Sequence, residues 1–403
     1  MVKITPISPY LPTYPEEFCT NPYDIIEKEE ELELKKNPRS LIHLILPNGE
    51  GDEVYQNAKK AYERFKSEQL IKKSNQPSIF LYRQESHEFS QQGLILGVSL
   101  QDYEDGNIVK HEHTREKPLK DRTKHIATIK AATGLVWNVF QADAEIKALI
   151  EEMKHVEPKF DFQMKGYRQL LWQITDPSKI DKLKELFATR KIFIADGHHR
   201  AASAAEYRKM QIANGADPNS EHAWQYLMTY VSSDDQIWIL PYNRVIRKLP
   251  MPKEEFIRKL EEVFEIEPAD KAFNPTEKHV IAICVKGQWL KATVKDQNFS
   301  NPRDALDVAI LQDRVLEQIL GIKDIRKDKN IFFVGEVKYY KNPELMQSEF
   351  IEKQGNDVFF NLFPVDIHDI EIIGGAGGVM PPKSTWFEPK LLSGLTIYPL
   401  DED

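Results

Sequence analysis

Residues 191–200 read Lys-Ile-Phe-Ile-Ala-Asp-Gly-His-His-Arg and give the clearest indication of the fold in this chain. The first half, Lys191–Ala195, is a short apolar run with two isoleucines, which is typical of a buried strand. The Asp-Gly pair then turns the chain. Alanine-rich sequence follows from about His199 to Asn214 and predicts a helix, with Gly215 as its C-cap. The stretch therefore predicts a strand, a tight turn and a helix in succession.

The residues of this turn predict a bound anion. Gly197 lets the backbone approach a ligand closely, and the free N–H groups of a helix start favour negative charge. His198, His199 and Arg200 add up to three cationic donors, and an arginine fork suits phosphate oxygens. In the simpler alternative, Asp196 is only an N-cap and the histidines lie on the surface. We favour phosphate binding, because four polar residues at one strand end exceed what capping requires.

A second polar segment lies earlier in the chain. It runs from His111 to Arg115 and is followed by Asp121 and Arg122. Glu112 is a candidate general base, and the arginines are candidate phosphate ligands. A solvated polar loop that leads into a helix with an exposed ion pair explains the same residues equally well.

The histidines also permit a metal site. His111 and His113, together with Asp196 and His198, offer the imidazole and carboxylate ligands that suit zinc and similar ions. Such a site would join two distant segments, and no HExxH-type helix supports it. A metal-dependent hydrolase is therefore an alternative hypothesis.

A glycine-rich stretch near the C-terminus is the third candidate. Residues 374–378 precede Lys383, Ser384 and Thr385, which resembles a phosphate-cradling loop. The stretch is not a Walker A motif, because Pro382 stands where a glycine must precede the lysine. A surface loop is the default interpretation.

Strand and helix patterns alternate along the rest of the chain and predict an α/β (α+β) protein. Apolar runs predict strands at 41–46, 79–83, 94–100 and 237–240, and a hairpin of 280–285 with 289–294. Helical patterns cover 52–73, 119 to a stop at Gly134, 180–186, 253–264 and 304–320. Asp24 and Glu27 have the spacing of a capping box, so helix capping is the simplest interpretation of Tyr23-Asp24. We expect one domain over 1–235 and a second over 236–403.

Composition excludes some classes of partner. The 54 basic and 63 acidic residues give a net charge of −9, which argues against non-specific binding to nucleic acid. Cys19 and Cys284 are too few and too distant for a disulfide framework. No run approaches the roughly 20 apolar residues of a membrane span, and the N-terminus lacks the apolar core of a signal peptide. These features predict a cytoplasmic protein.

Taken together, the motifs resemble a bacterial domain-of-unknown-function family with a DGHHR motif. The matching segments cover almost the whole chain: Asn21–Asp24, Tyr82–Gln84, His111–Thr114, Asp121–Arg122, Ile194–Arg200, Leu240–Arg244 and Met380–Lys390. Asn21 stands where many members carry proline. Asn243 stands where the family often has histidine, so we assign that position no role.

The resemblance implies a ParB/sulfiredoxin-like phosphate-binding core with an additional α/β domain. That superfamily includes kinases that phosphorylate free L-serine with ADP, ATP or pyrophosphate as donor. The resemblance therefore implies a monomeric or homodimeric serine kinase that uses Mg²⁺ and makes O-phosphoserine. Pyrophosphate fits the lack of an adenine-binding signature. A nucleotide-binding switch without catalysis is a further alternative.

The same resemblance suggests a role for each motif residue. The candidate proton acceptors are Glu112, Asp196 and Asp24, and Asp196 is also the candidate Mg²⁺ ligand. The candidate phosphate ligands are Gly197, His198, His199, Arg200, Arg115, Arg122, Lys383, Ser384 and Thr385. The candidate substrate ligands are Tyr23, His111 and Thr114. The tail with Lys383 is expected to return to the active site.

Overall fold

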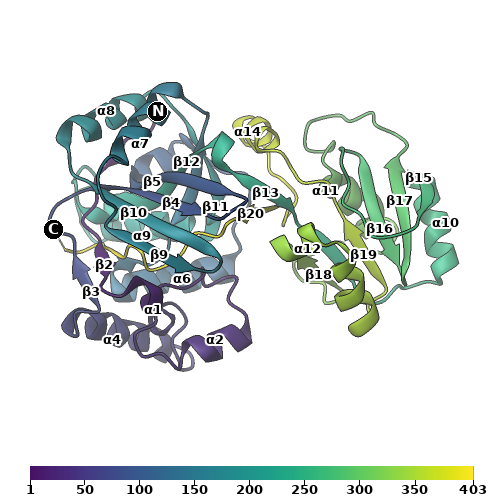
Figure 1. The fold of residues 1–403 in the computed structure, drawn as a ribbon, viewed down its shortest axis with the longest axis horizontal. Coiled ribbons are helices and arrows are strands. Elements are labelled where there is room, and N and C mark those ends of the chain that lie inside the picture. The colour runs from purple at the N-terminus through teal and green to yellow at the C-terminus, as the bar shows by residue number, and fades with distance from the viewer. Residues whose placement is uncertain (403) are drawn as a thin grey trace. The chain divides into compact units, whose positions relative to one another are not determined.

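The computed structural model describes residues 1–402 and divides the chain into two compact units (Figure 1). The first unit contains Met1–Ile237 and a C-terminal segment that begins at Pro389, and the second contains Trp238–Glu388. The boundary expected at 235/236 lies close to this division. The C-terminal segment, however, belongs to the first unit, because its strand β21 (Tyr398–Pro399) pairs with β7 (Ala131–Ala132). Both units combine helices with sheets, so the α/β fold class is confirmed.

A nine-stranded mixed sheet forms the centre of the first unit. Its strand order is β6-β11-β8-β12-β5-β4-β10-β9, and β1 pairs with β5. The β6–β11 and β8–β12 pairs are parallel, and the other pairs of this sheet are antiparallel. The strands are β1 (Ile4–Thr5), β4 (Ile79–Glu85), β5 (Ser90–Ser99), β6 (Ile108–Val109), β8 (Val136–Phe140), β9 (Phe160–Met164), β10 (Tyr167–Ile174), β11 (Ile192–Asp196) and β12 (Tyr226–Ser233). A small ladder joins β2 (Tyr10–Pro12) and β3 (Ile71–Lys73).

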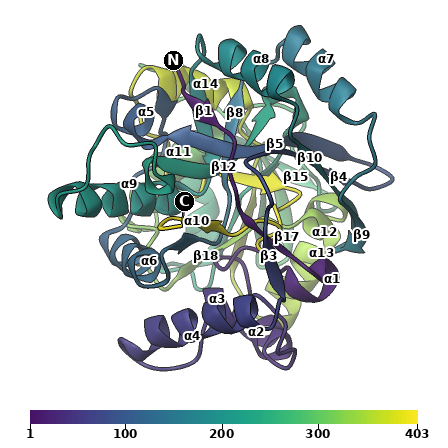
Figure 2. The same cartoon turned by 90° about the vertical axis from the view of Figure 1, so that its left-hand side faces the viewer.

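Helices of the first unit pack on this sheet and on one another. They are α1 (Pro15–Phe18), α2 (Lys28–Leu34), α3 (Ile42–Ile45), α4 (Glu53–Ser67), α5 (Leu100–Glu104), α6 (Glu116–Ile129), α7 (Ala144–Met153), α8 (Pro177–Phe187) and α9 (His198–Ala213), with the short turns η1 (Ala223–Gln225) and η2 (Asp234–Gln236). Figure 2 shows α6 beside α9, with α4 on the other side of α6. These three helices form the frame on which the candidate site is built.

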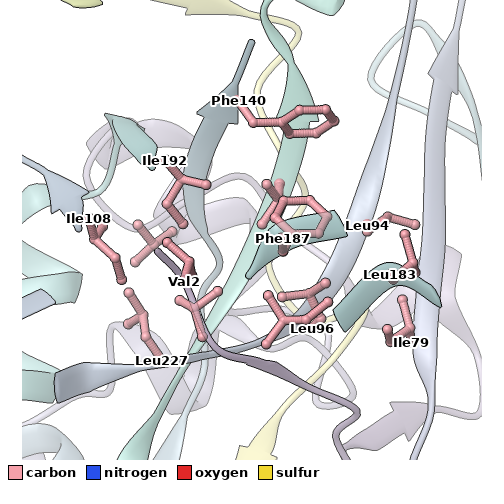
Figure 3. Close-up of a cluster of buried hydrophobic side chains, with 14 of the residues drawn as sticks. Val2, Ile79, Leu94, Leu96, Ile108, Phe140, Leu183, Phe187, Ile192 and Leu227 are labelled. Carbon is pink, nitrogen blue, oxygen red and sulfur yellow. The ribbon is translucent and has the colours of Figure 1, made fainter. Parts of the chain in front are cut away.

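The core of the first unit joins apolar residues of the sheet with residues of α5, α7, α8 and α9, and Figure 3 shows part of it. Leu94 and Leu96 of the sheet meet Leu183 and Phe187 of α8, all of them buried. The rings of Phe140 and Phe187 meet edge to face, with centroids 5.2 Å apart. Burial of such side chains contributes about 1.5–3 kcal/mol each, so this layer fixes the strand β11 that leads into the site.

The second unit is built on an antiparallel six-stranded sheet of order β15-β17-β16-β19-β14-β18. Its strands are β14 (Asn243–Ile246), β15 (Phe264–Ala269), β16 (Val280–Val285), β17 (Gln288–Val294), β18 (Ile331–Val334) and β19 (Val358–Asn361), and β13 (Trp238–Pro241) pairs separately with β20 (Thr385–Glu388). The helices are α10 (Lys253–Val263), α11 (Asp307–Ile310), α12 (Val337–Lys341), α13 (Glu344–Met346) and α14 (Ile367–Gly375), with π-helical turns η3 (Leu311–Glu317) and η4 (Gln347–Lys353). The predicted β16–β17 hairpin is confirmed.

Several sequence predictions are wrong in detail. The apolar run 41–46 is the helix α3 rather than a strand, because a short buried run has no period that separates the two. The predicted helix 52–73 ends at Ser67, and β3 follows. Helix α6 ends at Ile129, with Lys130 as its C-cap at φ +53°, rather than at Gly134. The 304–320 helix begins at Asp307 and becomes π-helical.

Two corrections concern motif residues. Helix α2 begins only at Lys28, with Glu27 as its N-cap and no side-chain cap bond, so Asp24 is not a helix cap. The glycine-rich stretch 374–378 is only partly a loop, because α14 extends to Gly375. Asp24 is therefore available for a role other than capping.

Candidate functional site

The turn at Gly197 requires glycine. Its φ of +97° places it in the left-handed region, and it is the N-cap of α9. A Cβ at this position would lie 3.1 Å from the guanidinium carbon of Arg200. The pairing of β11 with β8 shifts register between Ile194 and Asp196, which is typical of a bulge that redirects a side chain. The bulge and the left-handed Gly197 therefore place Asp196 directly before the N-terminus of α9.

Arg200 is held rigidly at this turn. Its Nη1 donates to the carbonyl of Leu135, and its Nη2 lies 3.2 Å from Oδ2 of Asp196. Burial by itself would lower the pKa of Arg200, but the charges of Asp196 and Asp24 outweigh burial and raise it. The guanidinium therefore stays cationic, and the interaction brings Asp24 into the site.

The two histidines of the motif fasten a loop rather than add charge. Nε2 of His198 accepts the backbone N–H of His111 at 3.4 Å, and Nε2 of His199 accepts that of Arg115 at 3.0 Å. The rings of His111 and His198 meet edge to face at 4.4 Å. The expectation of three cationic donors is therefore wrong, because a ring nitrogen that accepts a hydrogen bond carries no proton.

Burial keeps this pair of imidazoles neutral. It lowers the pKa of His111 to about 4 and that of His198 well below its usual range. A neutral imidazole costs far less to bury than an imidazolium. The segment 111–115, which also contains Glu112 and Thr114, is thereby tied to the first turn of α9.

Arg122 provides a second guanidinium, on α6. Its carbon lies 4.5 Å from the ring centroid of Tyr23, and its Nε donates to Asp121 at 2.7 Å. Asp121 also accepts the hydroxyl of Tyr55 at 2.8 Å. These contacts orient Arg122 and connect the N-terminal Tyr23-Asp24 motif with α6.

Both guanidiniums line one cavity within the first unit. Its walls are largely apolar and aromatic: Pro22, Tyr23, Ile45, Leu100, Arg122, His125, Ile126, Ala132, Thr133, Gly134, Val136, Arg200, Ala204, Tyr207, Trp224, Tyr226, Leu227, Met228, Ser393 and Leu400. Burial lowers the pKa of His125 to about 4, so its imidazole carries no charge at neutral pH. The cavity thus combines two cations with a largely apolar wall around a small space of about 50 Å³.

The structure gathers most of the predicted site residues in the first unit. Tyr23, Asp24, Arg122, the 111–115 segment and the 196–200 turn are joined by the contacts above. The predicted residues of the second unit lie in their own loop, where Lys383 is exposed and Ser384 donates to the carbonyl of Pro381 at 2.5 Å. Their expected part in the phosphate site stays a prediction.

The candidate metal ligands do not converge. No three of His111, His113, Asp196 and His198 bring ligand atoms within 4.8 Å of one another. His113 is exposed, and His198 uses a ring nitrogen to accept a backbone hydrogen bond. The geometry therefore gives the hydrolase hypothesis no support.

Sequence reasoning missed much of the cavity wall. Ala204 and Tyr207 follow Arg200 at spacings of four and seven, so the helical period of α9 could have placed them on the same face. Trp224 and Met228 had no such signal, because only the sheet brings them to α9. The hydrogen bond from Arg200 to the carbonyl of Leu135 could not be predicted either, because every residue has a backbone carbonyl and its use leaves no pattern in the sequence.

Comparison with known proteins now identifies the family. The fold and site define a mixed α/β protein with a cationic, apolar-walled cavity. The chain belongs to the family described as a protein of unknown function (DUF1015), whose profile matches residues 8–309. No curated protein matches the chain. Within residues 1–402, no helix is long and apolar enough to cross a membrane.

Several solved structures share a distant likeness. A mutant of free serine kinase in complex with AMP is 12% identical with a TM-score of 0.37, covering 73% of this chain and 87% of its own. SbnI from Staphylococcus aureus, truncated at its C-terminus, is 13% identical with a TM-score of 0.38, covering 77% and 90%. A conserved hypothetical protein from Pyrococcus furiosus is 12% identical with a TM-score of 0.34, covering 73% and 90%.

Proposed function

We propose that this protein is a phosphotransferase that phosphorylates the hydroxyl of a small molecule, with free L-serine as the acceptor. The observation that carries the proposal is the pairing of Arg200 and Arg122 on one cavity, next to the N-terminus of α9. Phosphoryl transfer requires mainly positioning and neutralisation of phosphate charge. A helix N-terminus with a fixed guanidinium supplies both. The choice of serine rests on the resemblance of the motifs to the superfamily of free serine kinases.

The cavity wall favours a nucleotide over pyrophosphate as donor. Pyrophosphate is wholly polar and would leave the apolar side of the cavity, with Tyr207, Trp224 and Met228, without a ligand group. A nucleobase is flat and apolar on its faces and suits aromatic and aliphatic walls. We therefore assign the phosphates to the arginine side and the base to the apolar side, where the cavity must widen from its volume of about 50 Å³ to admit a base. Gly197, Arg200 and Arg122 bind the phosphates in this arrangement.

Two carboxylates, those of Asp196 and Asp24, are assigned the two remaining roles, which are metal binding and proton acceptance. Asp196 accepts Nη2 of Arg200 and so fixes the guanidinium. We also assign Asp196 as the Mg²⁺ ligand, because Mg²⁺ prefers carboxylate and phosphate oxygens and would supply further charge neutralisation when bound. Asp24 is exposed, and its charge acts on both Arg200 and Tyr23, so we assign it to take the proton from the acceptor hydroxyl. Glu112 is the competing candidate for that step.

The test is an assay of product formation. Purified protein is incubated with Mg²⁺, L-serine and, separately, ATP, ADP, CTP or pyrophosphate, and O-phosphoserine is measured by mass spectrometry. We expect product with a nucleotide. Arg200→Met should lose at least 100-fold in kcat/KM, because a buried donor to the phosphates is removed. Arg168→Met is the matched control, since Arg168 is a surface arginine paired with Asp161 and Glu85.

Two results would contradict the proposal. Full activity of Arg200→Met would remove the phosphate assignment. Nucleotide binding by calorimetry without product from any donor or acceptor hydroxyl would instead support the nucleotide-binding switch. Asp24→Asn and Glu112→Gln separate the two proton acceptors, because only the true one should lower kcat while the affinity for the donor stays unchanged.

A further inference from the structure

The second unit contains a buried arginine that no carboxylate among residues 1–402 neutralises. Arg244, on β14, is 1% exposed. Among residues 1–402, no aspartate or glutamate forms an ion pair with it. Buried charges in proteins are normally paired, because removal of an ion from water is costly. A buried guanidinium without a carboxylate partner therefore suggests that the partner is a bound ligand.

The hydrogen bonds of Arg244 leave one edge of the guanidinium open. Nη1 donates to the carbonyl of Tyr242, which uses one side of the group. On the opposite edge, Nε has no partner and Nη2 lies 3.5 Å from the carbonyl of Pro382, at the limit of a hydrogen bond. Nε and Nη2 together are a pair of parallel donors that matches two oxygens of a carboxylate or phosphate.

Aromatic rings hold Arg244 in place but give these donors no acceptor. The guanidinium carbon lies 5.5 Å from the ring centroid of Phe333, and the ring of Tyr242 meets those of Phe333 and Trp386 at 5.6 and 5.2 Å. Ring faces attract a cation but accept no strong hydrogen bond. Burial accordingly lowers the pKa of Arg244 to about 9, as expected where no negative charge lies nearby.

A second cation belongs to the loop that covers Arg244. Pro382, whose carbonyl faces Nη2, is followed by Lys383, and Nζ of Lys383 lies 5.2 Å from the ring centroid of Tyr242. Lys383 has φ +59°, a left-handed conformation that is unfavourable for a residue with a side chain.

We propose that Arg244 and Lys383 form an oxyanion-binding site of the second unit, in addition to the phosphate site around Arg200. The ligand is the carboxylate or phosphate group of a small molecule, bound by Nε and Nη2 of Arg244 after the weak contact with Pro382 is exchanged. Lys383, exposed on the same loop, supplies the second positive charge. The motifs Tyr242–Arg244 and Pro381–Ser384 thereby acquire a common role.

The test measures anion-dependent thermal stability of the full chain. The first site is silenced by Arg200→Met, and inorganic phosphate or acetate is titrated against chloride at constant ionic strength. A ligand that binds only the folded state raises the unfolding temperature. We expect a saturable rise in the Arg200→Met protein and none when Arg244→Met is added. Saturation by phosphate identifies a tetrahedral ligand group, and saturation by acetate identifies a carboxylate.

Controls separate binding from damage to the fold. Arg247→Met is the matched variant, because Arg247 is exposed near the end of the same strand and lies 4.6 Å from the ring of Phe332; it should leave the rise unchanged. Without anion, Arg244→Met should be at least as stable as the parent, since it removes an unneutralised buried charge. If that variant does not fold, Lys383→Ala should still raise the half-saturating anion concentration at least threefold. The proposal fails if the anion-dependent rise in unfolding temperature persists in the Arg200→Met/Arg244→Met protein. It also fails if that rise is already absent in the Arg200→Met protein, or if Lys383→Ala leaves the half-saturating anion concentration unchanged.

Discussion

Acid should destabilise the first unit through two buried histidines. Burial lowers the pKa of His111 and His125 to about 4 in the folded protein, whereas an unfolded histidine titrates near 6.5. Between these values the unfolded chain binds more protons than the folded one, so stability rises with pH. The contribution of each neutral histidine is complete above pH 6.5 and is lost as the pH falls toward 4.

The size of this effect follows from the two pKa values. Linkage gives a loss of about 2 kcal/mol per histidine between pH 7 and pH 5, and about 4 kcal/mol for the pair. A domain is typically stable by about 5–15 kcal/mol, so such a loss is easily measured. His198 acts in the same direction, because burial also lowers its pKa.

Urea unfolding at pH 7, 6 and 5 measures this loss directly. In His125→Gln the amide can still donate to the carbonyl of Leu44, which lies 2.8 Å from Nε2 of His125, but the titrating group is gone. That variant should lose about 2 kcal/mol less than the parent between pH 7 and pH 5. His87→Gln, at an exposed position, is the control and should follow the parent. Equal pH dependence of His125→Gln and the parent would refute the reasoning.

Three further predictions follow from single positions. Gly197→Ala should cost about 1–2 kcal/mol of stability, because φ is +97° there, and should weaken donor binding in calorimetry; an unchanged melting temperature would contradict it. Tyr207→Ala should weaken nucleotide binding in calorimetry and leave pyrophosphate binding unchanged, whereas equal effects on both would contradict the placement of the base on the apolar wall. Burial raises the pKa of Asp307 to about 7, so the folded second unit binds the extra proton and should gain about 2 kcal/mol between pH 7 and pH 5. Asp307→Asn should abolish that gain in the same urea experiments.

The local sequence was sufficient to predict an element where all the residues that determine it are consecutive in the chain. The strand β11, the turn at Gly197 and helix α9 were predicted because apolar run, glycine and alanine-rich helix lie consecutively in the chain. The β16–β17 hairpin was predictable for the same reason. The run 41–46 was not, since four to six buried apolar residues fit a helix as well as a strand.

The charge states of the site depended on burial. His198 and His199 immediately precede Arg200 in the sequence, and each of these three side chains can carry a positive charge. In the fold, His198 is buried against His111 and stays neutral, while Arg200 keeps its charge through Asp196 and Asp24. A pKa is set by desolvation and by neighbours distant in sequence, so no local pattern could have made this distinction.

The α/β class, the strand–turn–helix at Gly197 and the set of motif residues could be predicted from the sequence, because these depend on local periodicity and residue chemistry. The folded chain alone brings Tyr23 against Arg122, places Arg122 and Arg200 on the same apolar cavity, and buries Arg244 with no carboxylate partner among residues 1–402. Each of these depends on contacts between residues far apart in the chain. Such contacts are fixed by the packing of the whole core rather than by any segment of it.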